Sequence, residues 1–264
     1  MDRIDRGYFE VPNPYNRKVS VVPATADKVH TIAFWSKDFG PFLEKRIGDD
    51  LLRRGFHLFF NFTLNSQAPL LEPRVPPLAD RLRQMEALSR RYDSRVVHWR
   101  FDPICFFRSA NGDLQHNLAD FDRISDVAAR VGIERCVTSF VDLYAKVRRR
   151  VGQLSGMQLE DPPTEKKIAT LKCMENLLRD KSIELALCCE KQLFESLPSE
   201  SGIGQGSCIP SDLLRAVYGG NLTLRKDTGQ RVRQGCGCRV SSDIGSYQDH
   251  PCYHNCLFCY ANPS

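Results

Sequence analysis

The sequence has no long hydrophobic run. No stretch of about 18 consecutive apolar residues occurs among its 264, so the sequence predicts no membrane-spanning helix. The charged opening MDRIDR is followed by no apolar segment, so it lacks the features of a secretory leader. The sequence also shows no internal repeat and no low-complexity tract. We therefore expect a cytoplasmic globular protein with no membrane partner.

Charge of either sign is not in large excess. Charged residues make up 26% and hydrophobic residues 42%, a composition typical of folded globular domains. The formal net charge of +5 is too small to argue by itself for a nucleic-acid partner. A chain of 264 residues is long enough for one large domain or two small ones.

Cysteine is what the sequence has in abundance. There are 11 cysteines, and five of them fall within the last 29 residues. Because thiols stay reduced in the cytoplasm, clustered cysteines indicate metal ligands or catalytic groups rather than disulfides.

Short β-rich segments alternate with amphipathic helical segments along most of the chain. Strands are predicted at residues 31–35, 57–63, 96–101, 135–141 and 183–188, which are rich in β-branched and aromatic residues. Helices are predicted between them at residues 41–54, 77–91, 118–131 and 162–179. This alternation predicts an α/β fold with right-handed βαβ units and a parallel sheet, as in a TIM-like β/α barrel, open or closed.

The composition changes near residue 199. Beyond it the chain is rich in glycine, cysteine and polar residues, and only residues 211–218 have a helical pattern. We therefore expect two parts: a β/α barrel-like domain over residues 1–198 and a loop-rich, cysteine-containing module over residues 199–264.

Polar side chains stand at or just beyond the ends of several predicted strands, where a β/α barrel places its chemistry. In the third predicted strand, alternation puts Arg100 and Asp102 on the face opposite to Val97, Trp99 and Phe101. Similar positions are held by Lys37, Asn61, Ser139, Asp142 and Glu190. The pattern predicts a site in the barrel lumen. The alternative is a structural ion pair between Arg100 and Asp102, since buried charges require partners.

Three cysteines stand close together near the C-terminus, in the segment CYHNCLFC. Cys252, Cys256 and Cys259 have the spacing C-x-x-x-C-x-x-C, which suits a [4Fe-4S] cluster. Three protein ligands leave one iron open for a small chelating molecule such as S-adenosylmethionine, and that pair carries radical chemistry. The alternative is structural zinc, for which His250 or His254 would supply a fourth ligand.

A second group of cysteines lies upstream of the first. Cys208, Cys236 and Cys238, with one of the adjacent Cys188 and Cys189, would give four thiolates for a closed site, either a second cluster or zinc. The alternative is scattered buried cysteine. The remaining Cys105, Cys136 and Cys173 lie in apolar runs or on a predicted helix, and we expect them to pack in the core.

Several motifs resemble those of an uncharacterised bacterial family, domain of unknown function 1848. They are NPYN at 13–16, FWSK at 34–37, WRFDPI at 99–104, SFVDLY at 139–144, GSCI at 206–209, CGC at 236–238, DIGSY at 243–247 and the tail from Cys252 to Asn262. The resemblance covers nearly the whole chain, but the family has no established reaction. Its members usually carry an additional N-terminal segment, which implies that a first strand–helix unit is missing here.

The triad is also similar to that of radical S-adenosylmethionine enzymes, including the lyases that repair spore photoproducts. That resemblance places Phe258 near the adenine of the cofactor, and it implies an electron donor of the flavodoxin or ferredoxin type. Because those enzymes carry the triad early in the chain, it also implies a circularly permuted barrel. In this hypothesis Lys37, Arg100, Asp102 and Asp142 are catalytic. Asn61, Ser139 and Glu190 join Phe258 in binding the cofactor.

Two other functions remain open at this stage. The tail cysteines could hold a metal that only staples the loops together, since metal binding energy is folding energy. A nucleic-acid-linked role is the second alternative. It depends on the basic run KVRRR at 146–150 and on Arg225, Lys226, Arg231 and Arg233, although such runs usually form solvated helix faces.

Overall fold

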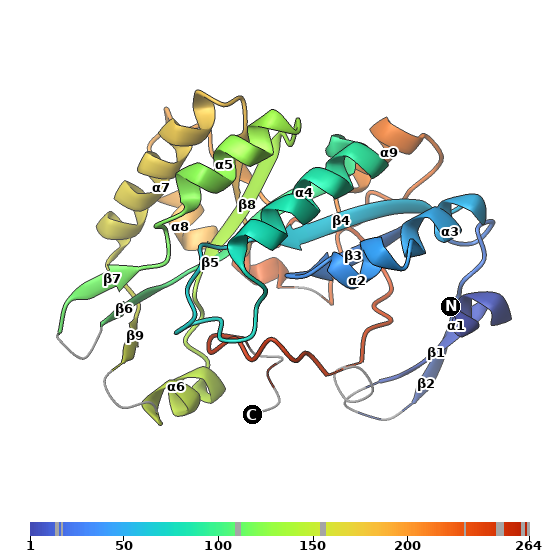
Figure 1. Cartoon of the computed structure of the whole chain (residues 1–264), viewed down its shortest axis with the longest axis horizontal. Helices are drawn as coiled ribbons and strands as arrows, with labels where there is room; N and C mark the ends of the chain where they lie inside the picture. The colour runs from blue at the N-terminus through green and yellow to red at the C-terminus, as the bar shows by residue number, and fades with distance from the viewer. Residues whose placement is uncertain are drawn as a thin grey trace.

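A computed structural model of the chain describes residues 1–13, 16, 18–108, 112–153, 157–229, 231–246, 251–259 and 262 (Figure 1). Its main sheet has six strands in the order β11-β10-β8-β5-β4-β3. All neighbouring strands in it are parallel. Their bounds are β3 (Thr31–Ser36), β4 (His57–Thr63), β5 (Val97–Ile104), β8 (Arg135–Phe140), β10 (Glu184–Leu187) and β11 (Gly204–Gln205).

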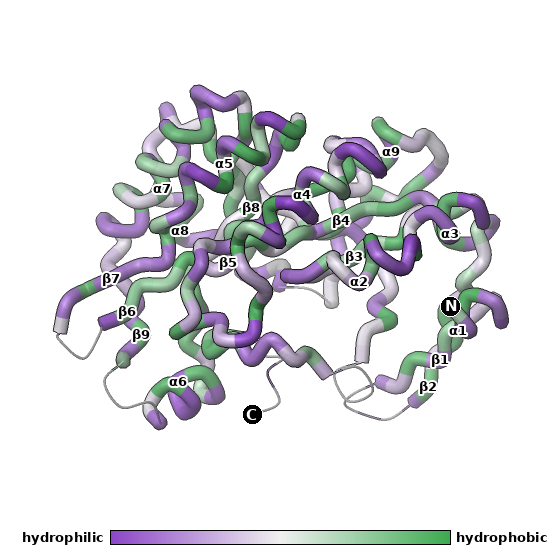
Figure 2. Tube along the Cα trace, in the orientation of Figure 1, coloured by the Kyte–Doolittle hydropathy of each residue, from purple (hydrophilic) through white to green (hydrophobic). Residues whose placement is uncertain are grey.

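One face of this sheet is covered by helices. Figure 1 shows α4 (Leu78–Tyr92), α5 (Phe121–Arg130) and α7 (Thr164–Arg179) lying across it. Alternate residues of β5 point toward them, and Trp99 and Phe101 contact the ring of Phe121. The two helices between β3 and β4, α2 (Gly40–Glu44) and α3 (Ile47–Arg53), pack at the β3–β4 end of the same core. Figure 2 shows β4 and β8 as largely hydrophobic tubes between these more polar helices.

The opposite face of the sheet is covered by the C-terminal part of the chain. Register places Arg100 of β5, Val137 of β8 and Ala186 of β10 in one row across the sheet. Val137 and Ala186 pack against Cys208 on this face. The segment before α8 (Lys191–Glu195) and the chain after β11 therefore lie on the same face of the sheet as Arg100. Tyr218, at the end of α9 (Ser211–Tyr218), stacks on His57 at the start of β4.

Smaller elements surround the main sheet. After α1 (Asp2–Arg6), β1 (Tyr8–Pro12) and β2 (Val19–Pro23) form an antiparallel hairpin. β6 (Phe106–Arg108) pairs with β7 (Leu114–His116) and β9 (Gln158–Glu160), and α6 (Ala145–Gly152) lies beside them. The 3-10 turns η1 (Ser94–Val96) and η2 (Val232–Gln234) complete the described elements. None of the helices in the described part of the chain has the length and apolarity needed to cross a bilayer.

The parallel α/β architecture predicted from the alternation is confirmed, and each of the five predicted strands is present. A closed barrel is not shown, because β3 and β11 stand at opposite edges of the described sheet. The helix predicted at residues 41–54 is two helices, since the backbone of Arg46 is left-handed between them, with φ at 51°. The boundary predicted near residue 199 stays a prediction, and the chain beyond it supplies β11 to the sheet.

Candidate functional site

Polar side chains that are buried or half-buried gather near the carboxyl ends of β3, β4, β5 and β8. We call this set the carboxyl-edge strip; it comprises Lys37, Asn65, Glu72, Arg100, Asp102 and Ser139. Lys37 follows β3, Asn65 follows β4, Arg100 and Asp102 belong to β5, and Ser139 is the last residue but one of β8. Parallel strands bring their carboxyl ends to one edge, which is why these side chains meet.

Asp102 is the centre of the carboxyl-edge strip. Its Oδ2 lies 2.6 Å from Nη2 of Arg100, and its Oδ1 accepts a 2.5 Å hydrogen bond from the hydroxyl of Ser139. Its backbone N–H donates to Oδ1 of Asn65 over 2.8 Å. Burial alone would raise the pKa of Asp102, but Arg100 and the Ser139 hydroxyl outweigh it, so the pKa lies below the usual range. Asp102 is therefore held as a carboxylate.

A second buried ion pair joins the carboxyl-edge strip. Nζ of Lys37 lies 2.7 Å from Oε1 of Glu72, whose side chain is only 3% exposed. The same Oε1 accepts a hydrogen bond of 3.1 Å from Nδ2 of Asn65, which links this pair to Asp102. Burial opposes the charge of Lys37, but Glu72 and the nearby thiol of Cys256 outweigh it and raise the pKa of Lys37.

The cysteine triad is seated directly against this pair. We call residues 252–259 the triad loop. Nζ of Lys37 lies 5.4 Å from the ring centre of Phe258, a cation–π contact. The backbone of the loop pairs with a preceding segment, because Leu257 N donates to Leu71 O and Arg74 N donates to His254 O. Residues about 180 positions apart in the sequence thereby place the triad beside the carboxyl-edge strip.

Arg150 of α6 holds the triad loop from its other side. Its guanidinium is buried and donates to the carbonyls of Leu257 at 2.7 Å, Cys259 at 3.0 Å and Asn262 at 3.2 Å. In the sequence Arg150 belongs to a basic run expected to be solvated, and that interpretation is wrong for this residue. Its neighbours Arg148 and Arg149 are exposed.

Within the triad loop, Cys256 is buried, whereas Cys252 and Cys259 are partly exposed. Burial raises the pKa of the Cys256 thiol to about 12, with Lys37 opposing the rise. Nδ1 of His254 donates to the carbonyl oxygen of Arg74 over 3.3 Å. The other proposed zinc ligand, His250, lies outside the described residues, as do the motif residues Pro14, Tyr15, Tyr247, Tyr260 and Ala261.

The upstream cysteines form a closed circuit of thiols, which we call the thiol ring: Cys188, Cys189, Cys208, Cys236 and Cys238. Sγ of Cys188 lies 3.7 Å from Sγ of Cys189 and also contacts the thiol of Cys208. The backbone N–H of Cys208 donates to Sγ of Cys238 over 3.2 Å, and the thiol of Cys236 is near enough to those of Cys189 and Cys238 for both to act on its pKa. The structure thus includes both members of the adjacent pair between which the sequence could not choose.

Glycines allow the segments of the thiol ring to approach one another. A Cβ on Gly237 would lie 2.7 Å from the carbonyl oxygen of Gly206, and one on Gly206 would lie 2.9 Å from that of Leu187. Any side chain at either position would force the backbones apart. The motifs CGC at 236–238 and GSC at 206–208 are therefore packed back to back beside the end of β10.

Arg100 joins the carboxyl-edge strip to the thiol ring. Its Nη1 donates to Sγ of Cys208 over 3.1 Å while its Nη2 pairs with Asp102. Burial works against the Arg100 charge, but Cys208 and Asp102 outweigh it and raise its pKa. A continuous chain of polar contacts thus runs from Phe258, through Lys37, Glu72, Asn65, Asp102 and Arg100, to Cys208.

The other predicted site residues lie around this centre. Asn61 of β4 is fully buried and donates to the carbonyl of Cys208 at 3.0 Å. Glu190 precedes α8 and accepts from Phe140 N, and burial raises its pKa. Asp142 is exposed, and its carboxylate pairs with Arg231 at 2.8 Å and accepts from the hydroxyl of Tyr144 rather than joining Asp102. Cys105 and Cys136 are buried as predicted, but Cys173 is exposed on the outer side of α7, because the buried face of that helix is Leu171, Met174 and Leu178.

Three residues of the site were missed from the sequence. Asn65 comes two residues after the end of β4, and Lys37 comes one residue after β3, so the same reasoning could have found Asn65. Glu72 lies in a loop with no strand beside it in the sequence. Arg150 is hidden inside a basic run, and only the position of α6 against the triad loop distinguishes it.

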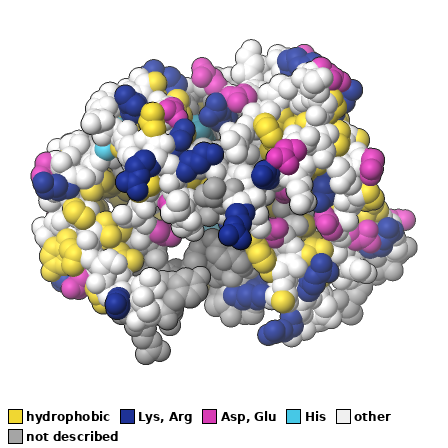
Figure 3. All heavy atoms as spheres, turned by 180° about the vertical axis from the view of Figure 1, so that it is seen from behind, with side chains coloured by type: hydrophobic (Ala, Val, Ile, Leu, Met, Phe, Trp, Pro, Cys, Tyr) yellow, Lys and Arg dark blue, Asp and Glu magenta, His cyan; other side chains and the backbone are white. Residues whose placement is uncertain are grey.

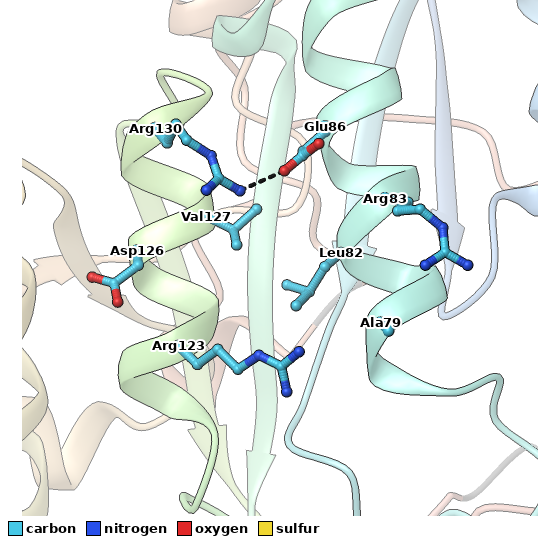
Figure 4. A pocket seen from close by; sticks show the side chains of 8 residues that line it. All are labelled: Ala79, Leu82, Arg83, Glu86, Arg123, Asp126, Val127 and Arg130. Carbon is cyan, nitrogen blue, oxygen red and sulfur yellow. Dashed lines mark hydrogen bonds and ion pairs between the residues drawn. The ribbon is translucent and has the colours of Figure 1, made fainter.

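Among the residues that the structure describes, no group of three or more His, Cys, Asp or Glu side chains has a geometry that could hold a metal ion. A cavity of about 390 Å³ lies between α4 and α5 and is lined by charged and small apolar side chains (Figure 4). One wall carries the Arg130–Glu86 ion pair. This cavity is on the helical layer and shares no lining residue with the carboxyl-edge strip.

A family model for a domain of unknown function (DUF1848) matches residues 1–261, nearly the whole chain. The chain therefore belongs to that family, which carries no assigned activity. No curated protein matches the sequence.

Proposed function

We propose that this member of the DUF1848 family is an iron–sulfur protein of the radical S-adenosylmethionine type. Cys252, Cys256 and Cys259 would bind a [4Fe-4S] cluster, and the carboxyl-edge strip would bind the cofactor and substrate. One observation carries the proposal: the triad loop lies against the buried Lys37–Glu72 pair, at the carboxyl edge of a parallel sheet.

The donor set fits such a cluster. Three thiols on one short loop match the number and softness of ligands that iron–sulfur clusters take from proteins. The thiol of Cys256 is close enough to those of Cys252 and Cys259 for both to act on its pKa. When bound, a reduced cluster with S-adenosylmethionine supplies a radical that can abstract hydrogen from a substrate.

The side chains of the carboxyl-edge strip would bind and orient the cofactor and the substrate. Asp102 is held as a carboxylate and Lys37 as an ammonium, so the strip offers fixed charges of both signs to an amino-acid-like group. Phe258 offers a ring face beside Lys37 for a flat heterocycle. Ser139 orients Asp102, and Arg150 keeps the triad loop closed over the strip. The substrate would be bound at this strip, and an external flavodoxin- or ferredoxin-like protein would supply electrons.

The proposal is tested on protein purified and reconstituted without oxygen. We expect about four irons and a matching amount of sulfide per chain to be lost in Cys256→Ala and retained in Cys173→Ala, the exposed cysteine on α7. We also expect the electron paramagnetic resonance spectrum of the reduced protein to change when S-adenosylmethionine is added, and deoxyadenosine to form.

Equal iron in wild type and Cys256→Ala would overturn the cluster assignment. A bound cluster whose spectrum ignores S-adenosylmethionine, with no deoxyadenosine formed, would remove the radical function. It would leave a protein whose tail metal only organises the loops.

A nucleic-acid-linked lyase is a second candidate with weaker support. Of the basic run at 146–150, Arg150 is not available to contact phosphates, because it is buried against the triad loop. Figure 3 shows the remaining Lys and Arg side chains of the rear face spread among acidic and hydrophobic ones. A duplex-binding measurement at low and moderate salt tests it, because phosphate contacts weaken steeply as salt rises.

A further inference from the structure

We propose that the thiol ring is a second metal centre, separate from the triad, that holds a single zinc-type ion through four thiolates. Cys208, Cys236 and Cys238 supply three of them, and either thiol of the adjacent pair Cys188 and Cys189 supplies the fourth. The inference does not depend on the radical function, because none of these residues belongs to the triad loop.

The thiols of the ring gather in a small volume. Cys188, Cys189 and Cys208 pack in one cluster, and the backbone N–H of Cys208 lies 3.2 Å from Sγ of Cys238. With zinc–sulfur bonds of about 2.3 Å, thiolates on a tetrahedral ion lie only about 3.8 Å apart. An iron–sulfur cluster places its own sulfides and irons between the cysteines, so it needs them further apart. The close packing of the cysteines therefore favours one ion.

Hydrogen-bond donors already point at two sulfurs of the thiol ring. Arg100 donates to Sγ of Cys208 over 3.1 Å, and the backbone N–H of Cys208 donates to Sγ of Cys238 over 3.2 Å. Four thiolates on a divalent ion carry a net charge of about −2, which would be costly in a buried site without such donors. Arg100 is itself 5% exposed, so its charge is directed inward rather than to solvent.

Binding of the ion requires changes in the thiol side chains. As described, the thiols form a circuit and do not converge on one point. Binding requires four thiols to lose their protons to solvent and to turn their sulfurs inward by side-chain rotation. The close packing permitted at Gly206 and Gly237 already holds the three segments together, so the backbone need not be rebuilt.

The ring has five thiols for four positions, and that surplus gives the sharpest test. Cys188 packs with Cys208, and Cys189 is near enough to Cys236 for the two thiols to act on each other's pKa, so the adjacent pair faces two sides of the ring. Losing one of the pair leaves the other to complete the site. Losing both leaves three ligands. Losing any of the other three also leaves three, because the adjacent pair fills only one position.

The experiment uses the full chain carrying Cys252→Ala, Cys256→Ala and Cys259→Ala, so that the triad contributes no metal. Zinc, iron and sulfide are quantified, and cobalt(II) is then exchanged into the site for absorption spectroscopy. We expect about one zinc per chain, no sulfide, and thiolate-to-cobalt charge-transfer bands of a tetrahedral centre. Adding Cys236→Ser or Cys208→Ser should weaken zinc affinity by at least about tenfold. The Cys188→Ser/Cys189→Ser pair should do the same, while either single change retains most of the zinc.

Iron with sulfide in this triad-free chain would overturn the single-ion assignment, as would undiminished zinc in Cys236→Ser. Cys173→Ser, on the exposed side of α7, serves as the control for cysteine loss. If a ring variant fails to fold, the cobalt spectrum of the triad-free chain decides alone: bands without thiolate character refute the proposal. Failure of the radical function leaves these outcomes unchanged, because the triad is absent throughout.

Discussion

The triad loop takes its three cysteines from eight consecutive residues, whereas the thiol ring takes five from three segments that are distant in the sequence. The triad loop depends on neighbours for its position: Arg150 binds its carbonyls, and Leu71 and Arg74 pair with its backbone. The segments of the ring pack directly on one another at Gly206 and Gly237, and Arg100 and Asn61 donate to Cys208. Both groups therefore depend on neighbouring side chains, but only the ring also packs its own distant segments together.

The two groups also differ in what surrounds them. Beside the triad lie Lys37 and Glu72, a pair in which Oε2 of Glu72 has no hydrogen-bond partner among the described residues and so is left for a bound molecule. Beside the ring lies Arg100, whose two ends are already engaged by Cys208 and Asp102. This contrast supports an open, reactive centre at the triad and a closed, structural centre at the ring. Each of the changes below tests that division, and they are ordered by the size of the expected effect.

The largest expected difference is in folding stability. Zinc bound by four thiolates contributes folding free energy directly, so Cys236→Ser/Cys238→Ser should lower the free energy of unfolding by about 5 kcal/mol or more. The three triad changes to alanine, in protein prepared in air, should lower it by about 1 kcal/mol, since only Cys256 is buried. Urea unfolding followed by circular dichroism measures both. Equal losses in the two variants would contradict the division into a structural and a reactive centre.

The sequence predicts local features of the two cysteine groups well and dispersed features poorly. Period-two alternation in β5 correctly separated Trp99 and Phe101 from Arg100, because the sheet has one face under helices and one under the C-terminal chain. The spacing of the three triad cysteines is local, so the sequence alone could predict a set of ligands there. The ring could be grouped only by counting cysteines, because its contacts depend on how β10 and β11 meet.

Other features depend on tertiary packing alone. A parallel sheet closes into a barrel only if its two edge strands pair with each other. No local sequence pattern predicts that pairing. The break at Arg46 within one amphipathic stretch comes from a left-handed backbone that propensities do not favour there. Arg149 and Arg150 are adjacent arginines of one basic run, and no sequence pattern distinguishes them. Only the packing of α6 against the triad loop buries Arg150 and leaves Arg149 exposed.

The next effect concerns the support of the triad loop. Arg150→Met keeps most of the apolar side-chain length but removes three hydrogen bonds to buried carbonyls, so we expect the loop to lose about 3 kcal/mol of docking stability. Iron bound after reconstitution should fall to less than half, and amides near Leu257 should exchange faster with solvent. Arg149→Met, an exposed change on the same helix, is the matched control. If both variants bind iron equally, Arg150 does not position the triad.

The smallest of the three effects lies between the two groups, at Asp102. Asp102→Asn removes the charge that pairs with Arg100, and we expect a loss of about 2 kcal/mol at neutral pH. Because the folded state lowers the pKa of Asp102, its contribution is present above the unfolded pKa and is lost as pH falls through the folded value. The stability gap between wild type and Asp102→Asn should therefore be full near pH 6 and shrink below about pH 4. Asp212→Asn, which breaks the exposed pair with Arg239, should cost about 0.5 kcal/mol or less. A gap that stays constant down to low pH would mean that Asp102 is not held as a carboxylate, and the charged connection from the triad to the ring would fail at its centre.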